Sequence, residues 1–463
     1  MNIRKLPASL LLAAFFVLPA HSQILRLPRF ITVQAQAPAG QTEAKPDHHI
    51  TAEEQNELLA SIDSILKFDA ADTDLPQKQS IKKQFVTRDQ VQAFVEKRMK
   101  DDQDAQRLQR SEVVLKKFGL LPADFKLQEF LVELLREQVA GYYDPDTKTV
   151  YLLDWLEPEQ QKPVMAHELT HALQDQNFGL KKWLRDDPKD HDSAQAEVSS
   201  DEQSAARSAV VEGQAMAVML DYLLEPAGQS VLQAPRIVDA IEAGMETGNG
   251  TPVFSGAPLY LKQLLLFPYT YGLDFTRDLL QRGGKKRAFA DVFKKPPMNT
   301  RQIMQPASYV QEEKAADMRV PELSKALGDK YERYDVGSIG QFDVNILIRT
   351  YGKKGENDKL AESWRGGWYY AVKPKSDATS DIGLVYVSRW ADEAAARQFA
   401  AIYAGYLPSR YPGVTAAGDN NWQTSQGPAS IQQQGASVVV MESLDAGAAA
   451  RVREAVDKSL SGK

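Results

Sequence analysis

Hydrophobic and polar positions alternate along the first part of the chain with the spacing of amphipathic helices. Thr51 is followed three residues later by Glu54, the pattern of a capping box, in which each side chain bonds the backbone N–H of the other residue. Further helices are expected at Ser61–Leu66, Gln90–Arg98, Leu108–Lys117 and Leu127–Val139, because apolar residues recur there every three or four positions.

The pattern changes at residues 140–154, where two runs with β propensity flank the turn-forming segment Asp144–Thr147. This arrangement predicts a β-hairpin. A helix is then expected to begin at Pro163, since proline is tolerated in a first helical turn. The segment Asp186–Ser204 is polar and is expected to be a surface loop, and a helical pattern returns at Ala205–Leu224.

From about Val336 onward, short helices and strands interleave. Helices are expected at Asp343–Arg349, Ala391–Ala404 and Ala448–Ser459, and strands at Gly366–Pro374, Ile382–Trp390 and Ala436–Ser443. This mixture predicts an α+β fold. We expect a mostly helical domain with a short β-hairpin over residues 51–335, and a smaller α+β domain over residues 336–463.

Length, composition and charge restrict the class of protein. A chain of 463 residues is too long for one compact core, so two or three domains are expected. The hydrophobic content of 43% and the charged content of 25% are ordinary for a soluble globular protein. The net charge of −7 argues against nucleic acid as a partner, because proteins that bind nucleic acid are usually basic.

The N-terminus is predicted to be an export signal. Two basic residues precede the apolar run Leu6–Leu18, which is too short to span a bilayer comfortably, and the small residues around Ser22 suit cleavage after that position. Residues 1–22 are the expected signal peptide and residues 23–50 a flexible linker. The chain is therefore expected to be secreted or periplasmic, without stable membrane insertion; an uncleaved N-terminal anchor is the alternative.

Two of the six histidines, His167 and His171, lie four residues apart in an expected helix. Residues four apart share a helix face, so both imidazoles can bind one metal ion, and Glu168 completes the H-E-x-x-H pattern. With zinc bound, Glu168 would act as the base for a zinc-bound water that attacks a peptide carbonyl. By itself, the short motif fits equally well an ordinary helix with two histidines on one side.

A third metal ligand is expected at Glu212. Its neighbours at helical spacing are small or apolar: Ala205, Ser208, Ala209, Ala215, Met216 and Met219. A carboxylate on such a buried face needs a partner, and a metal ion is sufficient. Gly213 beside it permits the close approach of another helix. The other candidates lie in the polar segment and are expected to be exposed: His191, Glu197 and Glu202.

The H-E-x-x-H motif with a later glutamate on a helix resembles the gluzincin (thermolysin-like) group of zinc metallopeptidases over residues 140–224. The resemblance implies a zincin-like fold for the helical domain and Zn²⁺ as the cofactor. It implies His167, His171 and Glu212 as metal ligands and Glu168 as the general base. It also implies that the hairpin before the metal helix ends in an edge strand that pairs with substrate.

Two parts of the expected site stay open. Met216 occupies the position where gluzincins often have an aspartate that supports the first histidine. The residues that orient the metal ligands are therefore not identified. No histidine follows His191, so the group that stabilises an oxyanion must be a tyrosine, an arginine or a backbone N–H. The candidates are Tyr269, Tyr271 and Arg301, although tyrosines in such a stretch are more often packing residues.

The sequence as a whole predicts an exported zinc-dependent peptide-bond hydrolase whose partner is a peptide or protein substrate. One alternative is a non-catalytic binding protein of the cell envelope in which zinc only braces two helices. In a second alternative the H-E-x-x-H motif is accidental and the C-terminal domain carries the function.

Overall fold

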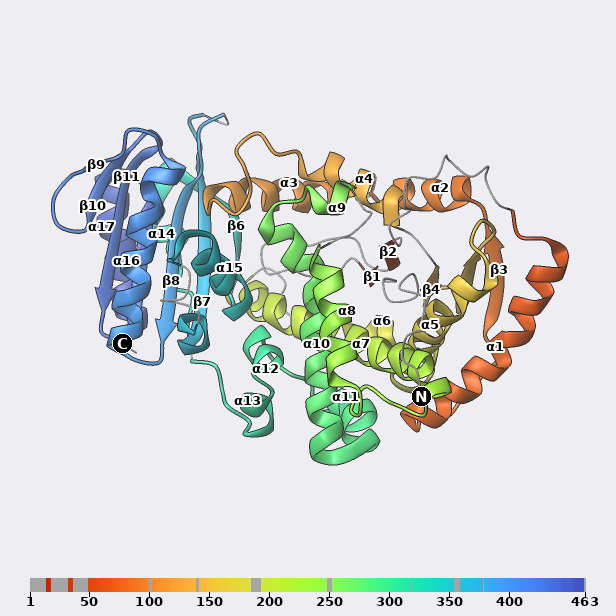
Figure 1. Cartoon of the computed structure of the whole chain (residues 1–463). Coiled ribbons are helices and arrows are strands. Elements are labelled where there is room, and N and C mark those ends of the chain that lie inside the picture. Colours follow the sequence, from red (N-terminus) through yellow and green to blue (C-terminus); the bar gives the residue numbers. More distant parts are fainter. Residues whose placement is uncertain are drawn as a thin grey trace.

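The computed structural model of this chain describes residues 14–17, 32–35, 49–99, 102–138, 141–184, 193–247, 252–316, 318–353, 359–377 and 379–461 (Figure 1). Most of the predicted signal peptide and linker lies outside these ranges, and so does His191. The N-terminal segments that are described form a strand pair, β1 (Ala14–Val17) and β2 (Thr32–Ala35). No helix among the described residues has the length and apolarity needed to cross a bilayer.

The predicted α+β class is confirmed: a helical region is followed by an antiparallel sheet. Thr51 and Glu54 form the predicted capping box at the first helix. The helices of this region are α1 (Ala52–Thr73), α2 (Arg88–Met99), α3 (Asp102–Lys117), α4 (Leu127–Gln138), α5 (Pro158–Phe178), α6 (Leu180–Leu184), α7 (Ala194–Leu224), α8 (Pro235–Thr247), α9 (Pro252–Ser255), α10 (Leu259–Lys285), α11 (Val292–Lys294), α12 (Thr300–Met304), α13 (Pro306–Val310) and α14 (Leu323–Leu327).

Two helix starts in this region differ from the prediction. Helix α5 begins at Pro158 instead of Pro163, because Pro158 already occupies the first turn, where a missing N–H leaves no bond unmade. Helix α7 begins at Ala194, and Ser193 caps it by accepting a backbone N–H of the first turn. The second half of the segment expected as a loop up to Ser204 is therefore helical.

The predicted hairpin is present as β4 (Tyr142–Asp144) and β5 (Thr149–Leu153). A third strand, β3 (Lys82–Val86), pairs with β5 in parallel, which makes the strand order β3-β5-β4. The expectation that the hairpin ends in an edge strand is therefore wrong, because β5 is the central strand. Its parallel partner was not recognised in the sequence, since two of the five residues of β3 are lysines.

The C-terminal region is a seven-stranded antiparallel sheet of order β6-β7-β8-β12-β11-β10-β9. Its elements are β6 (Tyr331–Ser338), α15 (Gln341–Tyr351), β7 (Trp364–Pro374), β8 (Gly383–Trp390), α16 (Glu393–Arg410), β9 (Thr415–Ala416), β10 (Asn421–Thr424), β11 (Gly427–Gln434), β12 (Ser437–Glu442) and α17 (Ala446–Leu460). Because β6 begins at Tyr331, the expected domain boundary at residues 335–336 falls inside a strand.

Strand β12 is covered on both faces. Val438 and Val440 belong to the core cluster that includes α16, whereas Val439 and Met441 pack in the cluster that includes α17. A continuous apolar run of this kind is typical of a strand with no solvent-facing side. The C-terminal sheet lies at the left end of Figure 1, β3 and α1 lie at the right end, and α7 and α10 cross between them.

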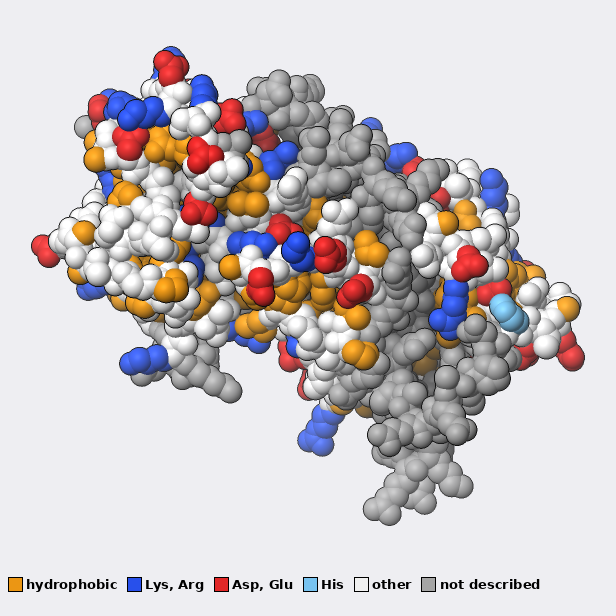
Figure 2. All heavy atoms as spheres, turned by 90° about the horizontal axis from the view of Figure 1, so that it is seen from above, with side chains coloured by type: hydrophobic (Ala, Val, Ile, Leu, Met, Phe, Trp, Pro, Cys, Tyr) orange, Lys and Arg blue, Asp and Glu red, His pale blue; other side chains and the backbone are white. Residues whose placement is uncertain are grey.

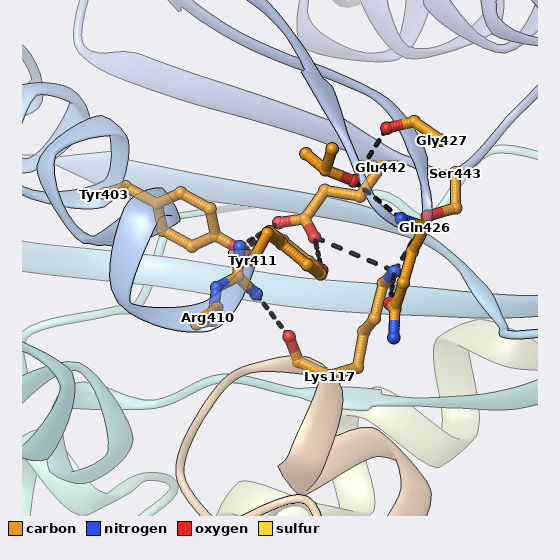
Figure 3. Close-up of polar contacts among 9 residues, drawn as sticks. Lys117, Tyr403, Arg410, Tyr411, Gln426, Gly427, Glu442 and Ser443 are labelled. Atoms are coloured by element: carbon orange, nitrogen blue, oxygen red, sulfur yellow. Dashed lines mark hydrogen bonds and ion pairs between the residues drawn. The ribbon is translucent and has the colours of Figure 1, made fainter. Parts of the chain in front are cut away.

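A buried polar cluster joins the helical region to the C-terminal sheet (Figure 3). The Glu442 carboxylate on β12 accepts hydrogen bonds from Arg410 at 2.6 Å, Tyr411 at 2.5 Å and Tyr403 at 2.8 Å. The Lys117 ammonium at the end of α3 lies 3.9 Å from the same carboxylate. Burial disfavours the charged form of Lys117 and lowers its pKa to about 8. The positive charge of Arg410 acts in the same direction, whereas the negative charge of Glu442 opposes the shift.

Acidic and basic side chains are interspersed on the face of the molecule shown in Figure 2. Among the described residues on that face, neither sign forms a continuous area. The described part of that face therefore presents no extended surface of a single charge.

Candidate metal centre

Helix α5 carries His167, Glu168 and His171 into the interior of the helical region. All three side chains are buried, because the flanking apolar residues Leu169 and Leu173 pack in the hydrophobic core. The two imidazole rings meet edge to face with their centroids 4.6 Å apart, since residues four positions apart lie on one helix face.

Helix α7 brings Glu212 to the same place. The face of α7 that the sequence predicts to be buried is confirmed as buried, since Ala209 and Met216 are inaccessible and only 5% of Glu212 is exposed. Gly213, the next residue, lies against Gly272 of α10, so the two helices approach closely, as the glycine suggested. This packing holds the carboxylate against the imidazoles from one side.

The ligand atoms of His167, His171 and Glu212 converge on one point. Glu212 Oε2 lies 3.2 Å from His167 Nε2 and 3.2 Å from His171 Nε2, and the two nitrogens are 3.0 Å apart. Among the described residues, these three form a group that could hold a metal ion. The structure therefore brings together the three ligands that the sequence suggested.

The charges of this cluster are tightly coupled. Burial alone would lower the pKa of His171, but the adjacent Glu212 carboxylate raises it above its ordinary range. Burial would likewise raise the pKa of Glu212, but the two histidines lower it. A positive charge at the centre of the cluster is therefore favoured, whether it is a proton or a metal ion.

Glu168 lies beside the cluster, and its two oxygens have different surroundings. Oε2 accepts the backbone N–H of Tyr143, on the edge strand β4, at 2.7 Å. Oε1 is buried and has no hydrogen-bond partner among the described residues. A cavity of about 10 Å³, lined among others by Gly141, Tyr151 and Met165, adjoins Glu168. This volume is close to what one water molecule needs.

The strand that bonds Glu168 is itself fixed to α5. The Tyr143 hydroxyl donates to the Asp175 carboxylate at 2.8 Å, and the Leu180 backbone N–H donates to the same side chain at 2.9 Å. The Lys148 ammonium forms an ion pair with Asp175. Asp175 therefore anchors the hairpin of β4 and β5 to α5.

Gln174 supports His171, a role that the sequence reading missed. Its Oε1 lies 2.9 Å from His171 Nδ1, and its Nε2 donates to Gln214 Oε1 at 2.8 Å and to the Val211 carbonyl at 3.0 Å. Gln214 donates in turn to the Ala288 carbonyl at 2.6 Å. The sequence does contain a signal for this role, because Gln174 follows His171 by three residues and therefore lies on the same helix face.

Of the three candidates for oxyanion stabilisation, Tyr269 lies at the cluster. Its ring is nearly parallel to that of His167, with the centroids 6.3 Å apart. Burial, followed by the negative charges of Glu212 and Glu168, raises the Tyr269 pKa. Tyr271 packs instead on Phe267 and faces other charged groups, and Arg301 pairs with Glu313 at 2.7 Å.

Comparison with known proteins covers the C-terminal region only. A family model described as a domain of unknown function (DUF8575) matches residues 329–453. The match includes the sheet and most of its helices and leaves out α5 and α7. Neither a curated protein nor a solved structure matches the chain.

Proposed function

We propose that this chain is an exported zinc-dependent peptide-bond hydrolase. The observation that carries the proposal is the convergence of His167, His171 and Glu212 to ligand separations of 3.0 and 3.2 Å beside the buried Glu168. Three protein ligands with an adjacent carboxylate are typical of catalytic zinc sites, which keep one coordination position open. Structural zinc sites are usually closed by a fourth protein ligand.

The donor set fits zinc. Two imidazole nitrogens and one carboxylate oxygen suit a borderline-soft ion, whereas calcium and magnesium prefer oxygen ligands alone. A tetrahedral ion with bonds of about 2.0 Å separates its ligand atoms by roughly 3.3 Å, close to the separations in this cluster. When bound, Zn²⁺ would supply Lewis acidity, polarising the peptide carbonyl and making an attacking water more acidic.

Glu168 is placed to move the proton. The Tyr143 N–H holds Oε2, and Oε1 has no bond among the described residues, so Oε1 can take a proton from the attacking water. The same carboxylic acid can then protonate the leaving amine, because Glu168 is carried by α5 next to the ligands His167 and His171. Glu168 thus serves first as base and then as acid.

Tyr269 is the best candidate for stabilising the oxyanion. A tyrosine hydroxyl keeps its proton at neutral pH, so Tyr269 beside His167 can donate a hydrogen bond to developing negative charge. Tyr269 lies on α10 next to Glu212 and His167, which suits this role. Tyr271 packs on Phe267 instead and faces other charged groups.

The burial of the cluster favours a second candidate function. His167, Glu168, His171 and Glu212 are each less than 10% exposed, and the adjoining cavity holds about one water. A metal ion that only braces α5 against α7 would need no more access than this. In the hydrolase, by contrast, the elements packed around the cluster must part to admit a peptide, and we expect the opening between α5 and the start of β4, where the small cavity beside Glu168 lies.

The two candidates differ in the effect of Glu168→Gln. In the hydrolase, this variant keeps stoichiometric zinc, measured by mass spectrometry of the metal, and loses hydrolysis of a fluorogenic peptide library by about 10²–10⁴-fold. Glu159→Gln is the matched control, because Glu159 is exposed on the same helix and pairs with Lys162. Undiminished turnover by Glu168→Gln would refute the mechanism. Zinc without any hydrolysis in the unmodified chain would favour the second candidate, and a chain without zinc would refute both.

A further inference from the structure

A chain of hydrogen bonds leads from the metal ligand His171 through two glutamines to a backbone carbonyl of the segment that follows α10. His171 Nδ1 lies 2.9 Å from Gln174 Oε1, and Gln174 Nε2 lies 2.8 Å from Gln214 Oε1. Gln214 Nε2 in turn lies 2.6 Å from the Ala288 carbonyl oxygen. Gln174 and Gln214, together called the amide relay, are 0% and 1% exposed. Their hydrogen bonds therefore do not compete with bulk water.

The amide relay can donate hydrogen bonds in one direction only. A backbone carbonyl oxygen accepts and cannot donate, so Gln214 must turn its NH₂ group toward Ala288. The oxygen of Gln214 then faces Gln174, which must present its own NH₂ group. The Val211 carbonyl, 3.0 Å from Gln174 Nε2, requires the same orientation. Two separate backbone carbonyls therefore fix Gln174 with its oxygen toward His171.

The amide oxygen beside His171 determines which ring nitrogen carries the hydrogen. Gln174 Oε1 can only accept, so the hydrogen lies on His171 Nδ1. A neutral imidazole has one N–H group, so Nε2 is left with its lone pair. This Nε2 lies 3.2 Å from Glu212 Oε2 and 3.0 Å from His167 Nε2. The neutral ring is thus held in the form in which Nε2 can bind a metal ion without moving a proton between its nitrogens.

The reversed orientation of Gln174 is unfavourable. Its oxygen would then face the oxygens of Val211 and Gln214, and its NH₂ group would face His171. Buried polar groups that meet like with like lose their hydrogen bonds and gain none to bulk water. Gln214 adds to this restraint because it is itself bonded to Ala288 and cannot turn over to suit a reversed Gln174.

The carbonyl at the end of the amide relay belongs to a π-helical segment, Lys286–Asp291. Helix α10 is interrupted just before this segment at Gly284, whose φ of 65° lies in the left-handed region that favours glycine. Phe293, in α11, stacks on Phe178 at the end of α5 with the ring centroids 3.9 Å apart, so the segment is fixed to the metal helix. Segments of π-helix are rare overall and frequent at functional sites. Ala288 therefore supplies the relay with an acceptor whose position is fixed.

We propose that Gln214 is a positioning residue of the metal centre, which acts through Gln174 and holds His171 with its hydrogen on Nδ1 and its lone pair toward the metal ion. The inference rests on the proposed metal centre but not on hydrolysis. An ion that only braces α5 against α7 would require the same orientation of His171.

The zinc affinity of variants of the full chain tests whether Gln214 acts through Gln174. Gln214→Met removes both polar groups of the amide and keeps nearly the same volume, so zinc binding should weaken about tenfold in competition with a chelator. In a chain that also carries Gln174→Ala, the same change should have little further effect, because the path to His171 is already broken. Losses that simply add in the double variant would overturn the proposal.

Gln341→Met is the matched control for a general loss of stability. Gln341 is also buried, at 2% exposed, and it also bonds a glutamine, since it accepts from Gln305 Nε2 at 2.6 Å. It lies on α15, which carries none of the metal ligands. Gln341→Met should lower the melting temperature as Gln214→Met does and leave the zinc affinity unchanged. Equal losses of zinc affinity in the two variants would overturn the proposal.

Nuclear magnetic resonance of the zinc-loaded chain, labelled with ¹⁵N-histidine, locates the hydrogen directly. His171 should carry its hydrogen on Nδ1, and this hydrogen should exchange with water about tenfold faster in Gln214→Met but not in Gln341→Met. A His171 without hydrogen on Nδ1 in the unmodified chain would overturn the proposal even if Gln214→Met did not fold. A chain that binds no zinc would refute the metal centre together with this inference. Zinc binding that Gln214→Met leaves unchanged would refute this inference alone.

Discussion

Gly213 on α7 and Gly272 on α10 are in direct backbone contact. A Cβ atom placed on Gly213 would lie 2.1 Å from the Gly272 carbonyl oxygen, and one placed on Gly272 would lie 2.2 Å from the Ala209 carbonyl oxygen. The contact sets the distance between the helix that carries Glu212 and the helix that carries Tyr269. A side chain at either glycine must separate these helices and displace the carboxylate from the imidazoles.

Gly272→Ala is therefore expected to lower the free energy of unfolding by about 1–3 kcal/mol and to weaken zinc binding. Chemical denaturation and zinc titration measure the two effects. Gly405→Ala is the control, because a Cβ at Gly405 in α16 meets nothing within 4 Å and replaces a helix-destabilising glycine. That variant should be slightly more stable, and equal losses in both variants would contradict the role of the contact.

Gln174→Ala is expected to weaken zinc binding about 10–100-fold while the fold is retained, because His171 loses the group that orients its ring. Competition with a chelator of known affinity measures the effect. Gln176→Ala is the control on the same helix, since Gln176 accepts backbone N–H groups of Lys78 and Gln79, away from the cluster. An unchanged zinc affinity in Gln174→Ala would show that the histidine is oriented by its packing alone.

A disulfide between α5 and the start of β4 is expected to block hydrolysis. A Cβ atom at Gly141 would lie 3.3 Å from a methyl group of Val164, so Gly141→Cys with Val164→Cys can form a bridge in a chain that has no other cysteine. The oxidised protein should be inactive and regain activity on reduction, whereas each single variant stays active under both conditions. Full activity of the oxidised form would place substrate access elsewhere.

Glu442→Gln is expected to lower the free energy of unfolding by about 3–5 kcal/mol. The change leaves Arg410 and Lys117 buried without the negative charge that both contact (Figure 3). Glu454→Gln breaks an exposed pair with Lys458 on α17 and should have no measurable effect. Similar stability of the two variants would mean that the buried cluster does not hold the sheet to the helical region.

The free energy of unfolding is expected to decrease as the pH rises from about 4 to about 7. Burial raises the Asp343 pKa to about 7, although the Gly340 N–H and the Tyr260 hydroxyl oppose the shift. In this window the folded chain holds a proton that the unfolded chain has lost, so the free energy of unfolding decreases with pH and levels off above about pH 7. Asp343→Asn should flatten the slope by up to ~1.4 kcal/mol per pH unit in denaturation series. An unchanged slope would assign the effect to other buried carboxyls such as Glu202.

Features that depend on local spacing were predictable. The capping box at Thr51, the amphipathic helices and the hairpin follow from residues within one or two turns of each other. The pairing of His167 with His171 belongs to this class, because a helix places residues four apart on one face whatever surrounds it. The buried face of α7 around Glu212 was also visible, since its small and apolar residues repeat at helical spacing.

Apart from the convergence of Glu212 on the two histidines, the features that join distant segments were not predictable. The sequence by itself determined which side chains α5 and α7 present to the interior. Only the tertiary structure decided that β3 makes β5 a central strand, that Gly213 meets Gly272, and that Tyr269 lies at the cluster while Tyr271 does not. The physical reason is that helix periodicity is set by backbone geometry within a few residues. Distances between helices and strands depend on how all the side chains between them pack.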